Sequence, residues 1–85
     1  MHSQRKFRAK DPGGLLNVRS GPGRDYPVIA AIADGSRVGV VAPMNTSTRM
    51  REPQTTYRDG YTWVLTDVDN GSQRYRGWVV FDYLK

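Results

Sequence analysis

Cysteine is absent from this chain of 85 residues, and histidine occurs only once, as His2. Without cysteine, the protein has no disulfide framework, no thiolate metal site and no cysteine nucleophile. The one histidine lies in a terminus that we expect to be loose, so a Ser-His pair or a His-metal site has no base to use. We therefore expect a protein that is not an enzyme, with no catalytic residues, no metal site and no cofactor.

Long apolar runs are also missing. No segment is long enough to cross a bilayer, and the first residues lack the apolar core of a signal peptide. Helical periodicity is missing too, because no window of about eleven residues repeats its apolar side chains at the helical spacing. These absences predict a chain without a membrane span that is built from strands.

The chain is short, and its positive charge is concentrated at one end. A chain of this size forms one small domain with a thin core. The formal net charge is +5, and Arg5, Lys6, Arg8 and Lys10 supply four of these charges, so residues 11–85 carry only +1. Two explanations stay open for this basic cluster. Cations on an edge strand discourage edge-to-edge pairing, and a basic patch attracts polyanions such as teichoic acid, nucleic acid or anionic lipid.

Short apolar runs that end at turn residues predict several strands. Leu16 and Val18 are two positions apart, so on a strand they share one face. Ser20-Gly21-Pro22-Gly23 then ends the strand, because proline lacks a backbone donor and the glycines can adopt positive φ. Further strands are predicted, in chain order, at 6–10, 28–32, 37–41, 61–66 and 73–81.

Turn signals separate these strands. We expect turns at 11–14, at Asp34-Gly35 and at 67–72, where Asn-Gly is a strong hairpin signal, and a final helical turn at 82–85. Residues 42–60 show no clear periodicity and are expected to form a loop that is functional or disordered. The pattern predicts an all-β domain in which about five to six short strands curl into a small barrel, with a long inserted loop at 42–60.

Several stretches together have the order of a known domain family. They are Leu16-Asn17-Val18-Arg19-Ser20-Gly21-Pro22-Gly23, Tyr26-Pro27-Val28-Ile29, Asp34-Gly35-Ser36-Arg37-Val38, Gly77-Trp78-Val79 and Tyr83-Leu84. In this order they resemble the bacterial Src-homology-3-like (SH3-like, SH3b) domains. The match spans 6–85 and leaves 1–5 as a flexible N-terminus. The segment 42–60 departs from the short connection usual in the family.

The resemblance implies an SH3-like barrel with a non-catalytic accessory role. Such modules often accompany cell-wall hydrolases and bind peptidoglycan or its peptide cross-bridges, while others occur in signalling or envelope proteins. The resemblance thus suggests the cell envelope or the exterior of the cell, whereas no signal peptide is visible at the N-terminus. The compartment is therefore left unknown at this stage.

Aromatic side chains suggest both a core and a site. Trp63, Trp78 and Phe81 are expected to be at least half buried, because a small barrel needs large side chains. Tyrosines in loops can instead stack on a sugar, a peptide or a base. We hypothesise that one ligand-facing groove is lined by Arg19, Arg24, Tyr26, Tyr57, Tyr61, Arg74 and Tyr75. For Arg19 the alternative is an ion pair with Asp25 or Asp82.

Three functions compete. The first is a module that recognises cell-wall peptidoglycan or a wall-associated peptide and so targets or regulates an enzyme. The second is a protein-interaction module that holds a partner peptide at a sheet edge or groove. The third, a nucleic-acid-binding small barrel, is disfavoured because the nearly neutral body neutralises few phosphates. In each case we expect a monomer.

Overall fold

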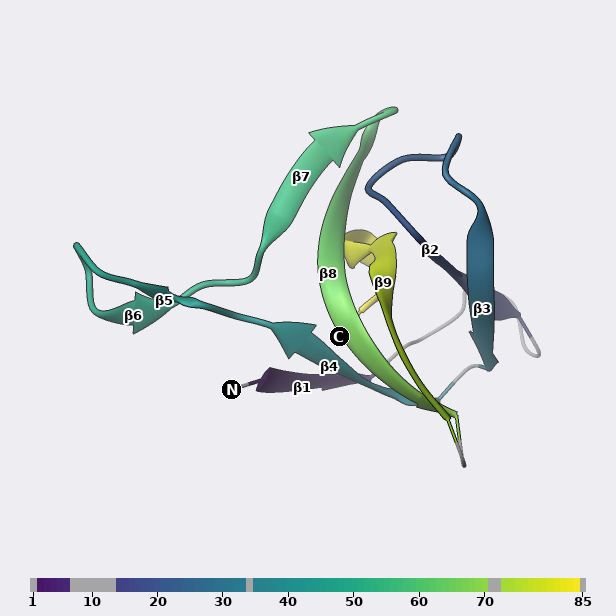
Figure 1. Ribbon diagram of the computed structural model, residues 1–85, viewed down its shortest axis with the longest axis horizontal. Coiled ribbons are helices and arrows are strands. Elements are labelled where there is room, and N and C mark those ends of the chain that lie inside the picture. Colours follow the sequence, from purple (N-terminus) through teal and green to yellow (C-terminus); the bar gives the residue numbers. More distant parts are fainter. Residues whose placement is uncertain (1, 7–13, 34, 71–72, 85) are drawn as a thin grey trace.

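A computed structural model of the protein describes residues 2–6, 14–33, 35–70 and 73–84. These residues form nine β-strands and one short 3₁₀ helix, so the predicted all-β fold class is confirmed. In chain order the elements are β1 (His2–Lys6), β2 (Leu15–Arg19), β3 (Val28–Ala33), β4 (Arg37–Val41), β5 (Met44–Asn45), β6 (Met50–Arg51), β7 (Thr55–Arg58), β8 (Tyr61–Asn70), β9 (Gln73–Val80) and η1 (Phe81–Tyr83) (Figure 1). Within the described ranges, no helix is long and apolar enough to cross a membrane.

Seven strands form one curved antiparallel sheet in the order β1-β4-β8-β9-β2-β3, with β7 also paired to β8. The ten residues of β8 serve three partners. Its first half pairs with β7, its second half with β4, and its other edge pairs with β9. The remaining strands, β5 and β6, form a separate hairpin that projects from the body as an arm (Figure 1).

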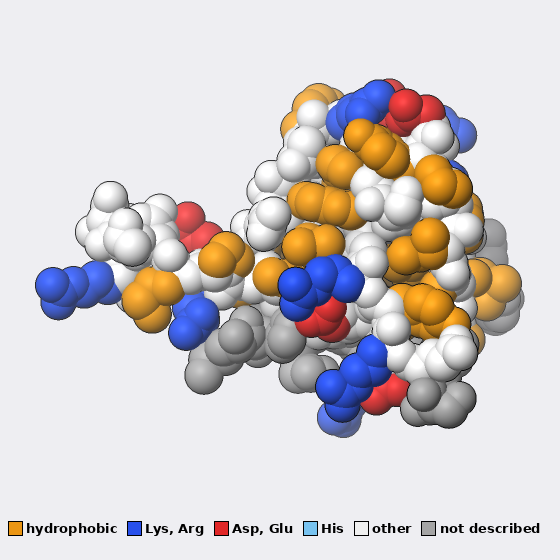
Figure 2. All heavy atoms as spheres, in the orientation of Figure 1, with side chains coloured by type: hydrophobic (Ala, Val, Ile, Leu, Met, Phe, Trp, Pro, Cys, Tyr) orange, Lys and Arg blue, Asp and Glu red, His pale blue; other side chains and the backbone are white. Residues whose placement is uncertain are grey.

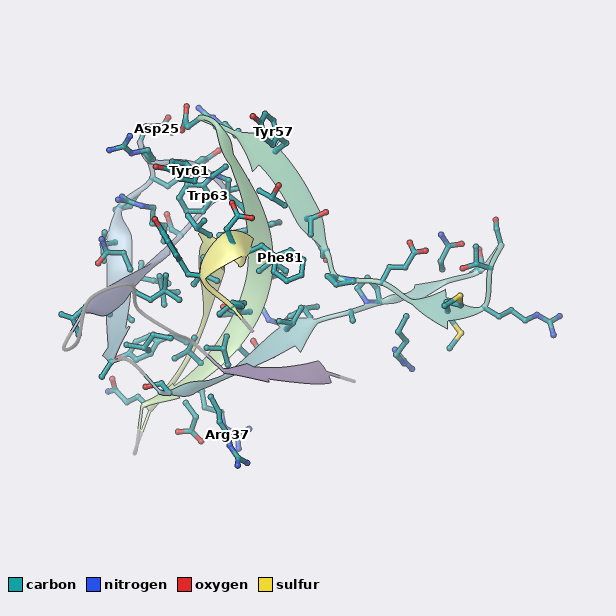
Figure 3. The ribbon with its side chains drawn as sticks, turned by 180° about the vertical axis from the view of Figure 1, so that it is seen from behind. Asp25, Arg37, Tyr57, Tyr61, Trp63 and Phe81 are labelled. Carbon is teal, nitrogen blue, oxygen red and sulfur yellow. The ribbon has the colours of Figure 1, made fainter. Side chains whose placement is uncertain are left out.

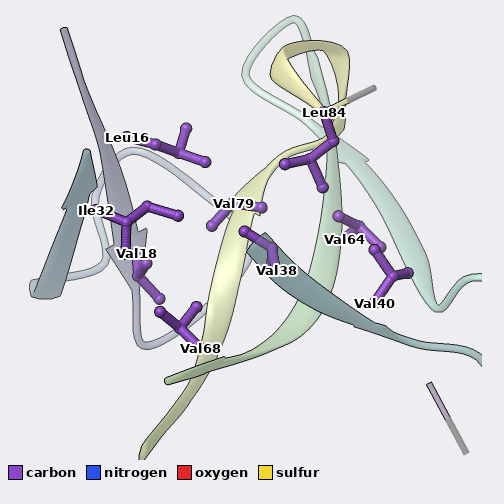
Figure 4. Packing of buried hydrophobic residues seen from close by; sticks show 9 residues of the cluster. All are labelled: Leu16, Val18, Ile32, Val38, Val40, Val64, Val68, Val79 and Leu84. Atoms are coloured by element: carbon purple, nitrogen blue, oxygen red, sulfur yellow. The ribbon is translucent and has the colours of Figure 1, made fainter. Parts of the chain in front are cut away.

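The core lies on one face of this sheet. Leu16 and Val18 both point into it, as their spacing on β2 predicts, and so do Val38 and Val40 of β4. Most of the cluster is valine, whose branched side chain suits a pleated surface. The full cluster comprises Leu16, Val18, Ile32, Val38, Val40, Val64, Val68, Val79 and Leu84 (Figure 4).

The segment 42–60 is richer in structure than a loop, because it contains β5, β6 and β7. β7 turns directly into β8 through Asp59 and Gly60, which have φ of 57° and 80°. Positive φ at both central residues is typical of a two-residue type I′ hairpin, for which Asp-Gly is a preferred pair. All four residues of β7 are exposed, so the strand shows no alternation that a periodicity search could detect.

The N-terminal strand is also displaced from its predicted position. β1 covers His2–Lys6 rather than 6–10, so it includes residues that we expected to be flexible, while 7–10 lie outside the described residues. Its sequence is polar, and it forms a strand by pairing with β4, from His2 opposite Val41 to Lys6 opposite Arg37. Pairing to a neighbour outweighs weak strand propensity here.

The predicted turn at 67–72 is shorter in the structure. β8 continues to Asn70, which pairs with Gln73, so only residues 71–72 connect the two strands. These two residues lie outside the described residues. The same holds for residues 11–13 of the turn expected at 11–14. The strand continues because Val68 is buried in the core. A C-terminal helical turn is present as η1, but it covers Phe81–Tyr83 rather than 82–85, and Lys85 lies outside the described residues. The Gly35 turn is confirmed by a φ of 87°.

Two positions require glycine because a Cβ atom would collide with neighbouring atoms, and not because the backbone has a positive φ. A Cβ on Gly21 would lie 2.3 Å from Cδ1 of Tyr26, and one on Gly77 would lie 2.7 Å from the carbonyl oxygen of Arg19. Neither glycine is among those with positive φ. Gly21 therefore does not use the positive φ that is open to glycine, and instead leaves room for the Tyr26 ring to pack against the backbone.

The substitution Gly77→Ala is expected to destabilise the fold by about 1–3 kcal/mol, as overpacking typically does. The added methyl group would also meet Val18 Cγ1 at 2.6 Å, and the β2 backbone cannot retreat without disturbing the β2–β9 contact. Urea unfolding followed by circular dichroism measures the change. Arg74→Ala, on an exposed position of the same strand, should change stability by less than about 0.5 kcal/mol. Equal stability of the two variants would contradict this account.

Candidate functional site

A groove of about 180 Å³ opens between β2, the start of β8 and η1. β2 contributes to it because its odd-numbered side chains point away from the core that Leu16 and Val18 enter. We call it the Trp63 groove, and it is lined by Leu15, Leu16, Asn17, Arg19, Arg24, Tyr61, Trp63, Val80 and Tyr83.

Trp63 supplies a rigid apolar wall of this groove. Its side chain is only 2% exposed although it lies outside the main core cluster. The indole Nε1–H donates a hydrogen bond to the carbonyl oxygen of Arg58 at 3.0 Å. The ring of Tyr61 packs edge-on, with centroids 6.3 Å apart (Figure 3). Trp78 and Phe81 are also largely buried, so the expectation for all three aromatic residues is confirmed.

Arg19 fixes the loop that borders the groove. Its Nη1 donates hydrogen bonds to the carbonyl oxygens of Arg24 at 3.1 Å and Tyr26 at 2.8 Å. The expectation of an ion pair with Asp25 or Asp82 is therefore wrong, because the guanidinium turns to backbone acceptors that the tight loop leaves without strand partners. Arg19 lines the groove, but its hydrogen bonds serve the loop.

The same loop is attached to the β7–β8 turn by a group of polar contacts. Arg58 Nη2 lies 3.0 Å from Asp25 Oδ2, and its guanidinium carbon lies 5.4 Å from the centroid of the Tyr26 ring. The backbone N–H of Arg24 donates to Asp59 Oδ2 at 3.0 Å. The Asp25 carboxylate, followed by the Tyr26 hydroxyl, raises the pKa of Arg58 above its ordinary value. These contacts connect the loop that carries Arg24, a residue of the groove, to the β7–β8 turn.

The guanidinium of Arg24 differs from that of Arg19. Arg24 takes part in hydrogen bonds through its backbone N–H and carbonyl groups. Among the described residues its guanidinium has no hydrogen bond or ion pair, and the residue is exposed at the groove. Arg24 is thus the arginine of the groove whose guanidinium has no partner among the described residues.

Tyr57 and Tyr61 lie on opposite faces of the β7–β8 ribbon. Tyr57 pairs with Thr62, and neighbouring residues of β8 alternate in direction, so Tyr57 points away from the face that carries Tyr61 and Trp63 (Figure 3). Its side chain is 75% exposed. Tyr26 is occupied by its packing against Gly21 and Arg58. Neither Tyr26 nor Tyr57 lines the groove.

Arg74 and Tyr75 lie at the other end of the β8–β9 ladder. They line a separate depression of about 580 Å³, the Arg37 hollow, which includes Arg37, Gly39, Asp67, Val68, Asp69, Arg74, Tyr75 and Arg76. The hypothesis of one common groove is therefore wrong: the structure brings together Arg19, Arg24 and Tyr61 only. A signal for this separation existed, because the hairpin predicted around 67–72 puts Arg74 and Tyr75 next to its turn and Tyr61 at its far end.

The Arg37 hollow is dominated by ion pairs within the protein. Arg76 donates two hydrogen bonds to the Asp67 carboxylate, at 2.7 and 2.9 Å, and these bonds raise the pKa of Arg76. Arg74 lies 3.9 Å from Asp69. The hydroxyl of Tyr75 donates to the side chain of Gln73. Much of the charge in this hollow is already paired.

The sequence analysis missed several residues of the Trp63 groove, namely Leu15, Leu16, Asn17, Trp63, Val80 and Tyr83. For Leu15 and Asn17 a signal exists, since they alternate with the core residues Leu16 and Val18. An exposed leucine at such a position, 66% exposed in the structure, marks an outward apolar site. For Val80 and Tyr83 no local signal exists, because they reach the groove through the pairing of β9 with β8.

Replacing Arg19 with methionine is expected to destabilise the fold by about 1–3 kcal/mol, because two loop carbonyl groups lose a charged donor. The matched substitution Arg24→Met should leave stability within about 0.5 kcal/mol of the wild type, since that guanidinium contacts no described residue. Chemical unfolding of both variants measures the difference. Two variants of equal stability would contradict the structural role of Arg19.

Within the described ranges, no three His, Cys, Asp or Glu side chains lie close enough together to hold a metal ion. Comparison of the chain with protein-family models, with curated proteins and with solved structures found no match. The resemblance to bacterial SH3-like domains therefore stays a prediction that is based on the sequence motifs alone.

Proposed function

We propose that this protein is a non-catalytic binding module that recognises a segment of cell-wall peptidoglycan or a wall-associated peptide in the Trp63 groove. The observation that carries the proposal is the composition of this groove. It combines the apolar or aromatic side chains of Leu15, Tyr61 and Trp63 with two polar side chains free of described partners, those of Asn17 and Arg24. Binding sites commonly join an apolar lining to a few orienting polar groups.

The size of the groove supports a polymeric ligand. Its volume of about 180 Å³ is smaller than the roughly 300–1,000 Å³ of typical small-molecule pockets. A groove of this size accommodates one or two units of a longer chain, whose remaining units extend over the surface. A peptide or glycan strand meets this requirement, whereas a compact metabolite or cofactor would be left mostly exposed.

Arg24 indicates the charge of the ligand. A planar guanidinium binds a carboxylate through two parallel hydrogen bonds. Because Arg19 is held by backbone acceptors, Arg24 is the groove cation that can offer this contact. A wall peptide that carries a carboxylate can make this contact, while Leu15 and Tyr61 would contact the apolar faces of neighbouring units.

The Arg37 hollow is a weaker candidate, although it is larger. Asp67, Asp69, Arg74 and Arg76 form ion pairs there, so a ligand would have to compete with contacts inside the protein. Exposed pairs of this kind contribute little on their own and do not create a shaped apolar surface. We therefore assign ligand binding to the Trp63 groove.

The proposal is tested by retention of the purified protein on insoluble peptidoglycan sacculi at low and at moderate salt. Wild type is expected to be retained in both conditions, because a shaped site depends less on screened charge. Arg24→Met should weaken binding about tenfold, which corresponds to about 1.4 kcal/mol. Arg74→Met, the same substitution in the Arg37 hollow, should bind like the wild type.

Each other outcome has a definite meaning. Equal losses for Arg24→Met and Arg74→Met, together with release at moderate salt, would identify a general attraction of polyanions and contradict the proposal. Absence of retention in both salt conditions would also contradict it. The second candidate, a protein-interaction module, would then be favoured, and it rests on the uncovered strand edge described below.

A further inference from the structure

In the described part of the chain, one side of the edge strand β3 has no strand partner. It stands last in the strand order of the main sheet, and within the described residues it pairs only with β2. Figure 1 places it at the margin of the body opposite the β5–β6 arm. Alternate backbone N–H and C=O groups of an edge strand point away from its neighbour. The outward-pointing backbone groups of β3 are thus oriented to form hydrogen bonds with another strand and so extend the sheet.

Over Ala30–Ala33, β3 lacks the usual protection of an edge. Soluble proteins block such strands with charged residues, prolines or bulges. The six residues of β3, Val-Ile-Ala-Ala-Ile-Ala, include no charge and no proline. The register with β2 shifts between the pairs Val18–Ala30 and Arg19–Val28, so β3 has one bulge, at Ile29, while Ala30–Ala33 is paired without interruption. The small alanine side chains also leave the backbone of this regular stretch accessible.

The other end of the sheet contrasts with this strand. The sequence of β1 includes the cationic residues Arg5 and Lys6. β7, which is paired to β8 on one side, ends in Arg58. The absence of charge is therefore particular to β3 among the outer strands of the main sheet.

The surface around β3 is apolar. Six large hydrophobic side chains are exposed in the described part of the chain, and three of them, Leu15, Val28 and Ile29, belong to the β2–β3 hairpin. They are 66%, 46% and 40% exposed, and Leu15 lies directly opposite Ala33. Figure 2 shows hydrophobic side chains at the surface on this side of the body. An apolar margin beside an open edge favours association with an uncharged strand.

We propose that β3 pairs antiparallel with β3 of a second copy of this chain and so forms a dimer with twofold symmetry. With the axis at Ala31, residue 31 faces itself and Ala30 faces Ile32 of the second copy, so the pairing uses the regular stretch Ala30–Ala33 and not the bulged Ile29. The flanking pair joins a small side chain to a large one, and no charges oppose each other. A second copy thus matches both the uncharged character and the shape of the edge.

The dimer has a defined limit. A twofold interface uses the same patch on both copies, so pairing ends at two and does not propagate. It would also place two Trp63 grooves in one particle, which strengthens binding to any repetitive ligand. The pairing itself does not depend on the proposed function, because none of its contacts requires a ligand.

Sedimentation equilibrium from about 10 µM to about 1 mM tests the proposal, a range suited to a small interface. Wild type is expected to shift from monomer to dimer, while Ala31→Lys remains monomeric, because the two introduced charges would face each other. Ala31 is exposed, so the substitution should preserve the fold, and circular dichroism checks this. Thr46→Lys, which adds the same charge on the exposed β5–β6 turn, should dimerise like the wild type.

A second experiment uses the absence of native cysteine. In the proposed dimer the Cβ atoms at position 31 lie about 4.5–5.5 Å apart, near the range of a disulfide. Mild oxidation of Ala31→Cys should therefore give a disulfide-linked dimer much faster than oxidation of Thr46→Cys. A monomeric wild type, species larger than a dimer, or equal cross-linking at the two positions would overturn the proposal. If the wild type is monomeric, the edge of β3 would instead be a candidate binding site for an extended peptide of a partner protein.

Discussion

The ladder between β8 and β9 is the interaction on which the rest of the structure depends. Its eight residue pairs run from Trp63 opposite Val80 to Asn70 opposite Gln73. β4 and β7 attach to the free edge of β8, and β2 attaches to β9 through Arg19 and Trp78. One face of the ladder supplies core valines, and the other supplies the wall of the Trp63 groove. A single pairing thus determines both the core and the site.

Charge in this protein is used largely for internal contacts. Arg19 holds two backbone carbonyl groups, Arg58 joins the first loop to the β7–β8 turn, and Arg76 pairs with Asp67 across the ladder. The planar guanidinium suits these roles because it donates several hydrogen bonds in fixed directions. Arg24 differs from these arginines, because its guanidinium has no such contact in the described chain and lines the Trp63 groove.

Residues that share a chemical type in the sequence separate in the fold. Tyr57 and Tyr61 are four positions apart, yet a two-residue turn places them on opposite faces of one ribbon. Arg74 and Tyr75 share a strand with Val80, yet strand direction takes them to the other end of the sheet. Composition identified aromatic and cationic residues as candidates for a site, but only the register of the ladder showed which of them meet.

The sequence by itself determined the all-β class, the positions of β2, β3 and β4 and the burial of the tryptophans, because alternation and turn chemistry are local properties of the chain. The tertiary structure alone decided that His2–Lys6 joins β4, that three strands form within 42–60, and that Leu15 and Tyr83 share a groove. These features depend on pairing between residues distant in sequence. Such pairing follows from the packing of the whole domain, so no short stretch of sequence records it.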